Sequence, residues 1–184
     1  MRSLLVAAVV IPGSAWAEPV PASGSDPGND LRVVAVANLP VEGWAEVAGL
    51  GLGATVVLGV PVARDTSVSV RAGAVVHLPV TTSLGARTRL IEIPFLGGAR
   101  YRVAERGSVR GFLMGEVGVI VARTDVTVAG LSDDDTDVRF GSVLGAGFEV
   151  GRVELTAAAW LADLSDLDHG IGFSLTAGAR LGSW

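Results

Sequence analysis

The sequence lacks three features, and each absence removes a class of protein. None of its 184 residues is cysteine, which excludes disulfide bonds and thiolate metal centres. No run of 18 or more apolar residues occurs, so a membrane-spanning helix is excluded although 49% of the chain is hydrophobic. Lysine is also missing, and the net charge of −5 argues against binding to nucleic acid, which requires a basic surface.

The N-terminus has the pattern of a secretory signal peptide. Arg2 precedes a short apolar segment (4–11), and Ala-Trp-Ala at 15–17 provides the small-x-small site that signal peptidase cleaves. We therefore predict a signal peptide over 1–17. The next stretch, "EPVPASGSDPGND", is too polar and too rich in proline to pack, so we predict a flexible leader over 18–30.

From Leu31 onward, hydrophobic residues recur at every second position, which predicts β-strands. In 67–80 the even positions are valine, leucine or alanine, whereas the odd positions include serine, arginine, glycine and histidine. Five segments alternate clearly and three alternate weakly; one of the weak ones contains "TAAAW", which also fits a helical turn. The predicted strands are 47–60, 67–80, 91–103, 137–150 and 171–181, with the weaker segments at 31–38, 109–124 and 152–163.

The connections between the predicted strands alternate between short and long. The short ones are 61–65, 104–108 and the single Gly151, and the long ones are 39–46, 81–88, 125–136 and 164–169. The last two long connections are acidic. Outer-membrane barrels are arranged in this way, with short turns in the periplasm and longer loops outside the cell.

The polar face of the predicted strands distinguishes a membrane barrel from a soluble one. The apolar face points inward in a soluble barrel and outward, toward lipid, in a membrane barrel. Here the polar face is mostly glycine, serine and threonine with single charges, whereas a water-exposed sheet favours bulky polar residues. Small side chains and paired charges suit a narrow lumen. We therefore predict a structural polar network in the lumen from Arg71, Glu92, Arg100, Arg102, Glu116, Arg139, Glu149, Glu154 and Arg180.

Four segments, in order and at matching spacing, resemble the porin-like outer membrane protein β-barrel domain family. "LIEIPFLGGARYRV" (90–103) is similar to the family's L-E-I-P-L-L-x-x-x-Y-R-F strand, and "RFGSVLGAGFEVGRVEL" (139–155) is similar to its tight hairpin. "GFLMGEVGVIV" (111–121) and "GIGFSLTAGARLGSW" (170–184) resemble two further strands. The resemblance implies an eight-stranded barrel in the outer membrane, inserted by the barrel-assembly machinery. The chain departs from the family in ending with Trp184 instead of phenylalanine.

The two histidines and one acidic segment are the other candidates for a functional site. His169 lies beside a serine and two aspartates in 164–169, and His77 lies near the outer end of its predicted strand. A lipid-modifying enzyme at the barrel rim is thus one alternative, although no spacing matches a nucleophile elbow. The segment 132–137, "SDDDTD", lacks the glycine and the bidentate glutamate of an EF-hand, so we expect a solvated loop that binds divalent cations weakly at most.

Together these features predict an all-β protein: an antiparallel, up-and-down, eight-stranded transmembrane β-barrel over 31–184, preceded by a cleaved signal peptide. Because side chains fill so narrow a barrel, we expect a non-enzymatic structural or surface-interaction protein of the bacterial outer membrane, without a cofactor. Its expected partners are outer-membrane lipid and the barrel-assembly machinery. The alternatives are a narrow channel or transport component, a lipid-modifying rim enzyme, and a soluble periplasmic ligand-binding barrel with its apolar face inward.

Overall fold

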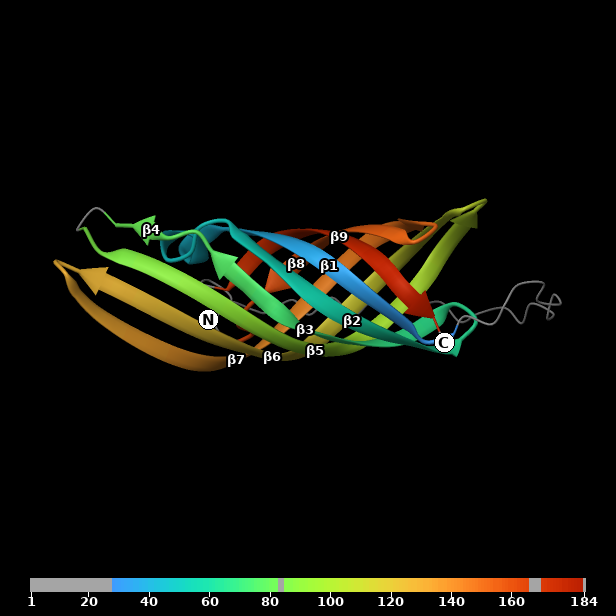
Figure 1. The fold of residues 1–184 in the computed structure, drawn as a ribbon, viewed down its shortest axis with the longest axis horizontal. Coiled ribbons are helices and arrows are strands. Elements are labelled where there is room, and N and C mark those ends of the chain that lie inside the picture. The colour runs from blue at the N-terminus through green and yellow to red at the C-terminus, as the bar shows by residue number, and fades with distance from the viewer. Residues whose placement is uncertain (1–27, 83–84, 166–169, 184) are drawn as a thin grey trace, which may run out of the picture.

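The structure, a computed structural model, describes residues 28–82, 85–165 and 170–183. The predicted signal peptide and most of the predicted leader lie outside the described residues, as do His169 and Trp184. Within the described ranges, eight long antiparallel strands form a closed barrel, which confirms the predicted fold class (Figure 1). The elements are β1 (Asp30–Pro40), the 3₁₀ helix η1 (Glu42–Glu46), β2 (Gly51–Ala63), β3 (Thr66–His77), β4 (Val80–Thr81), β5 (Arg87–Arg106), β6 (Val109–Val128), β7 (Leu131–Val150), β8 (Val153–Leu161) and β9 (Ile171–Ser183).

Long strands that follow one another in the chain pair with each other, and the pairing of β1 with β9 closes the ring. Because Asp30 pairs with Ser183, both ends of the described barrel lie at the same end of the molecule. The tight turns at 64–65, 107–108 and 151–152 lie at this end too, and we call it the short-turn end. Gly107 and Gly151 have positive φ angles of 62°, which a residue with a Cβ adopts less readily. The opposite end is called the long-loop end.

The predicted loop over 125–136 is wrong, because these residues extend β6 and β7 into a long hairpin. The two strands join through Ala129 and Gly130, whose φ angles are 49° and 84°. Every residue of the extension pairs across the hairpin, from Val128 opposite Leu131 onward. Aspartate has low strand propensity, which explains why the pattern indicated a loop, but a two-residue turn with positive φ angles holds the strands in register. The hairpin projects beyond the barrel in Figure 1.

Other strand boundaries at the long-loop end also differ from the predictions. β2 begins at Gly51 instead of residue 47, because η1 and the buried Ala48 occupy the preceding segment. β3 ends at His77, and Pro79, which has no backbone N–H to donate, follows before the short β4. The "TAAAW" segment forms part of β8, so the helical alternative for it is wrong.

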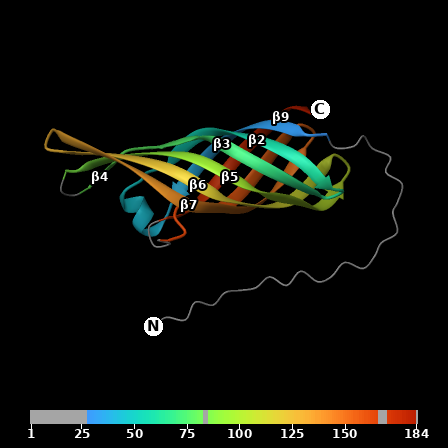
Figure 2. The ribbon, with the colours of Figure 1, turned by 90° about the horizontal axis from the view of Figure 1, so that it is seen from below.

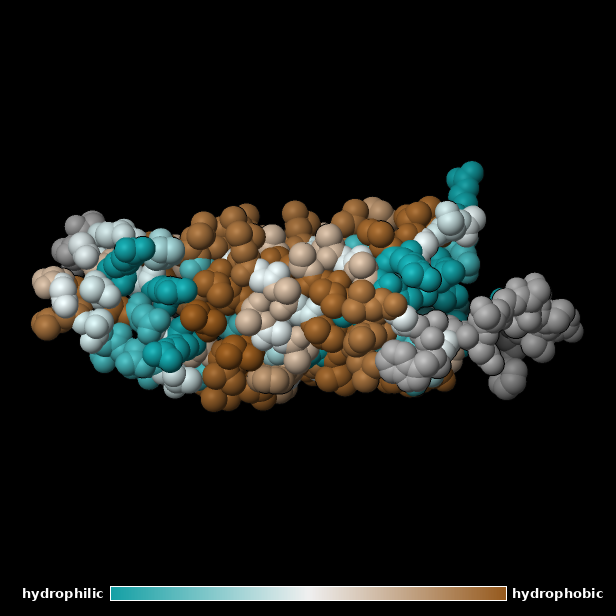
Figure 3. Space-filling model, viewed as in Figure 1, coloured by the Kyte–Doolittle hydropathy of each residue, from teal (hydrophilic) through white to brown (hydrophobic). Residues whose placement is uncertain are grey.

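The outside of the barrel is covered by aliphatic side chains. Along β3, Val70 is 62% exposed and the adjacent Arg71 only 6%, and along β9 Leu175 is 68% exposed and Ser174 only 2%. Hydrophobic residues occupy the middle of the face shown in Figure 3, and hydrophilic residues gather at both ends. This arrangement contradicts the soluble alternative, in which the aliphatic face points inward. No helix in the described ranges is long and apolar enough to cross a membrane.

Candidate functional site

The short-turn half of the lumen contains an ionic network centred on two glutamates. Glu154 of β8 accepts a hydrogen bond from Arg100 Nη1 at 2.6 Å and another from Arg32 Nη1 at 3.1 Å, both on its Oε2. Arg32 also contacts Asp30. The guanidinium of Arg100 lies over the ring of Phe112, with Cζ 3.3 Å from the ring centroid. Arg100 is therefore held by a carboxylate and by a cation–π contact together.

Glu149 of β7 connects further strands to this network. Its Oε2 accepts from Arg100 Nη2 at 3.0 Å, and its Oε1 lies 3.6 Å from Arg110 Nη1. Arg180 of β9 contacts the same carboxylate. Because Arg100 binds both glutamates, the network joins β1, β5, β6, β7, β8 and β9 across the lumen. Ionic contacts across the interior resist deformation of a barrel, provided each charge keeps its partner.

Arg71 and Glu116 form a second ionic group, between β3 and β6. Arg71 Nε donates to Glu116 Oε2 at 2.6 Å, and Arg71 Nη1 donates to the hydroxyl of Thr55 at 3.0 Å. Ser69 Oγ donates to Glu116 Oε1 at 3.2 Å. Both charged side chains are buried, so each depends on the other for its charge balance.

Three of the nine predicted lumen residues lie outside these groups, and one of them, Glu92, is described below with its partner. Arg102 is at the short-turn mouth, 3.6 Å from carboxylate oxygens of both Asp65 and Glu105. Arg139 is at the base of the projecting hairpin, where its Nε donates to Asp137 at 3.1 Å. Strand parity places a residue on the inner face but does not indicate its height along the barrel, which explains both cases.

Three residues of the network were not among the predicted ones: Asp30, Arg32 and Arg110. Asp30 lies in the predicted leader, although it is the first residue of β1. Arg32 alternates with Val34 and Val36, so the inner face of β1 looked as apolar as its outer face. The only signal in the sequence for Arg32 was an isolated charge inside a strand pattern.

The long-loop half of the lumen contains an apolar cluster, which the sequence did not indicate. Its core includes Trp44 from η1 and Trp160 from β8, packed with Leu96 and Ile120. Trp44 packs so closely on Gly172 that a Cβ there would lie 2.6 Å from the Trp44 ring. The 3₁₀ helix thus inserts an indole into the long-loop end of the barrel and closes it.

A buried pair of titratable groups lies beside this plug. His77 Nε2 and Glu92 Oε2 are 2.9 Å apart, and both side chains are fully buried. His77 Nδ1 is 2.9 Å from the carbonyl oxygen of Gly49, which can only accept, so Nδ1 carries a proton. Glu92, predicted within the lumen network, therefore has a histidine as its partner.

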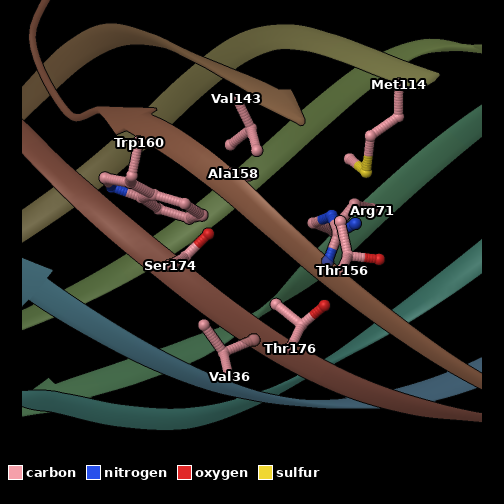
Figure 4. Close-up of a pocket in the computed structure, with 9 residues that line it drawn as sticks. All are labelled: Val36, Arg71, Met114, Val143, Thr156, Ala158, Trp160, Ser174 and Thr176. Carbon is pink, nitrogen blue, oxygen red and sulfur yellow. The ribbon is translucent and has the colours of Figure 1, made fainter. Parts of the chain in front are cut away.

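Small cavities lie within the lumen, between side chains of the described residues. One has a volume of about 10 Å³ and lies between Arg71, Trp160 and Ser174 (Figure 4). Another, of about 20 Å³, lies between Arg71, Arg100 and Glu116. Since a water molecule needs about 10–15 Å³, each cavity has room for about one water and none for a solute.

The candidate sites at the long-loop end are not assembled in the described residues. Ser165 Oγ donates to Asp163 Oδ1 at 2.6 Å, while residues 166–169, with His169, lie outside the described ranges. His77 is enclosed and faces Glu92, away from solvent. The acidic segment 132–137 is a strand, so its side chains alternate between two faces. Among the residues that the structure describes, no three His, Cys, Asp or Glu side chains converge to hold a metal ion.

Comparisons with known proteins identify the fold. No family model matches the chain, and no curated protein matches it. A structure of Ail, the attachment invasion locus protein of Yersinia pestis, matches with a TM-score of 0.58 and 14% identity, over 84% of this chain and 97% of that one. A second Ail structure, in complex with the heparin analogue sucrose octasulfate, matches with a TM-score of 0.60 and 13% identity, over the same shares. The chain therefore has the fold of the small, eight-stranded outer-membrane β-barrels.

Proposed function

We propose that the protein is a non-enzymatic integral β-barrel of a bacterial outer membrane, with a structural role and a surface-interaction role. The observation that carries the proposal is the contrast between its two faces. Outward residues such as Val70 and Leu175 are more than half exposed, whereas the inward Arg71 and Glu116 are buried as an ion pair. Hydrocarbon is the solvent that favours such an exterior, because a charge there at mid-bilayer costs about 2–4 kcal/mol.

The interior favours a structural role over transport. The ionic network fills the short-turn half, and the indoles of Trp44 and Trp160 fill the long-loop half. The cavity shown in Figure 4 and the second cavity, near Arg100, are each about the size of a water molecule. A filled lumen is usual for barrels of this strand number. The enclosed His77 and the absence of a converged metal-ligand group in the described ranges give no support to the enzyme alternative.

The lipid partner is expected to contact arginines just above the aliphatic band. Arg87 and Arg89 share the outward face of β5 with Ile93 and Phe95, and both are exposed. Guanidinium groups at that height suit the phosphates of outer-leaflet lipid, because Arg binds phosphate through paired hydrogen bonds. These residues would fix the depth of the barrel in the membrane.

We assign the surface-interaction role to the projecting hairpin of β6 and β7. The Ail structure contains an anionic ligand, sucrose octasulfate. In this chain the hairpin is acidic, with exposed Asp133, Asp134, Asp135 and Asp137. A partner that binds there would be cationic, so we do not expect this chain to bind an anionic ligand such as the one in the Ail structure.

Fractionation of cells that express the full chain tests the proposed function. We expect the protein in the outer-membrane fraction, resistant to carbonate extraction, with a mobility on gels that changes only after heating because the closed barrel resists detergent. A cytoplasmic-membrane position, or release by carbonate with heat-independent migration, would contradict the proposal.

A further inference from the structure

The outer part of β7 is a free sheet edge. β7 runs from Leu131 to Val150, but β8 pairs only with residues 142–150. In the described chain, 131–141 are therefore paired on one side only, with β6. Such an edge presents backbone N–H and C=O groups that another strand can use. Figure 2 shows the hairpin extending beyond the rest of the barrel, where a partner can reach it.

One hydrogen bond shows which backbone groups point to this edge. Leu164, in the connection after β8, donates its N–H to the carbonyl oxygen of Phe140 at 2.8 Å. In an antiparallel strand the N–H and C=O of one residue point to the same side, and alternate residues share that side. Val138, Thr136, Asp134 and Ser132 therefore also direct their backbone groups to the edge. The carbonyl oxygen of Phe140, the edge position nearest the barrel, is already occupied by the N–H of Leu164.

Two of the edge donors are capped by neighbouring aspartates. The N–H of Thr136 donates to Asp135 Oδ1 at 2.9 Å, and the N–H of Val138 donates to Asp137 Oδ1 at 2.7 Å. Each carboxylate occupies the place that a carbonyl of an added strand would take. Self-capping of this kind disfavours pairing with a neutral or acidic strand, including the same edge of a second copy of the chain.

A cationic strand would compensate for the loss of these caps. Asp133, Asp135 and Asp137 lie two residues apart, so their side chains share one face of β7. Residues of an added strand on the same face would lie beside them, and opposite charges stabilise such cross-strand pairs. A carbonyl oxygen of the added strand would replace each carboxylate on its backbone N–H, and the incoming cation would bind the carboxylate that is displaced. Arg139, which pairs with Asp137, shows that a guanidinium fits on this face.

We propose that the edge of β7 from Ser132 to Val138 binds an extended polypeptide segment with arginine or lysine at every second position, by strand addition. This inference rests on the proposed function, because it names the class of partner for the surface role. Backbone hydrogen bonds provide the affinity, and the three aspartates provide selectivity for a basic strand.

The test uses the full mature protein folded in detergent micelles and a labelled nine-residue peptide of alternating arginine and threonine. Fluorescence anisotropy measures the affinity, and amide hydrogen exchange reports protection at Thr136 and Val138. We expect saturable binding with slowed exchange at these two amides. A peptide of the same sequence with an N-methyl group on every residue keeps its charge but has no backbone N–H to donate on either edge, so its binding should be at least 10-fold weaker. Equal binding of the two peptides would overturn strand addition.

Variants of the hairpin separate the edge from general electrostatic attraction. Thr136→Pro removes one edge donor without changing charge, and it should weaken binding about 10-fold or more. The pair Asp133→Asn and Asp135→Asn should weaken binding more than Asp125→Asn with Asp134→Asn, which removes two charges from the opposite face. Equal losses from the two pairs would contradict the proposal. Heat-modifiable migration of each variant confirms a folded barrel, so failure here is distinct from failure of the proposed function.

Discussion

Replacing Arg71 with leucine is expected to lower the free energy of unfolding in micelles by about 3–5 kcal/mol. Arg71 Nε donates to Glu116 Oε2 at 2.6 Å, and the side chains are 7% and 3% exposed. Leucine would leave the Glu116 carboxylate buried with only the Ser69 hydroxyl as a donor. An unpaired buried charge is far more costly than the pair is stabilising. Urea unfolding followed by tryptophan fluorescence measures the change.

The double variant Arg71→Leu with Glu116→Leu is the matched control for this prediction. Removing both charges leaves no unpaired group, so the double variant is expected to be more stable than Arg71→Leu alone. If the second substitution lowered the stability further by its own full amount, the two residues would be independent, and the ion pair would not be the reason for the loss.

Replacing Val70 with arginine is expected to cost about 2–4 kcal/mol and to reduce the amount of assembled barrel in cells. Val70 is 62% exposed on the outer face of β3, where we place hydrocarbon. An arginine there must either desolvate its charge in lipid or distort the bilayer around it. The fraction of heat-modifiable protein in outer membranes, together with unfolding in lipid vesicles, measures both effects.

Val62→Arg provides the comparison, because Val62 is 58% exposed on β2 close to the short-turn end. The cost of arginine on a lipid-facing surface falls to about 0–1 kcal/mol near the interface, so this variant should assemble nearly as well as the unaltered protein. Equal losses from the two substitutions would show that the cost of an arginine does not depend on its depth, and that the aliphatic surface is not in contact with a bilayer.

The sequence predicted the wall of the barrel well, because strand alternation is a local property. Residues such as Val70 and Arg71 point to opposite sides wherever the strand lies, so parity separated the two faces, and the composition of the polar face assigned it to the lumen. The glycine-rich inner face indicated a narrow lumen for the same reason. Tight turns at Gly107 and Gly151 were also visible, since the positions need positive φ angles.

The contents of the lumen were harder to predict, because they depend on which strands face each other across the barrel. The contact between His77 and Glu92 joins residues 15 positions apart, and that between Arg32 and Glu154 joins residues 122 positions apart. Alternation does not specify the height of a side chain, which is set by strand tilt and register. For this reason Arg102 and Arg139 were assigned to the network, while Arg32 was missed.

The hairpin and the indole plug were missed for different reasons. The aspartates of 132–137 have the composition of a loop, and only the pairing imposed by the turn at Gly130 makes them a strand. Trp44 lies in a segment with no clear period, and its burial depends on the space that Gly172 leaves on the opposite strand. The hairpin arises from a local turn, whereas the plug arises from a contact between segments distant in the sequence.

The orientation of the aliphatic face can be measured by a spin-label scan. The chain has no cysteine, so single cysteines can be placed along β9 from Phe173 to Ala179 and labelled in lipid vesicles. We predict that oxygen accessibility, which is high in hydrocarbon, peaks at Phe173, Leu175, Ala177 and Ala179 and is low at the residues between them. Accessibility to a water-soluble relaxation agent that peaks at the aliphatic positions instead would show that they face water, and it would contradict the account.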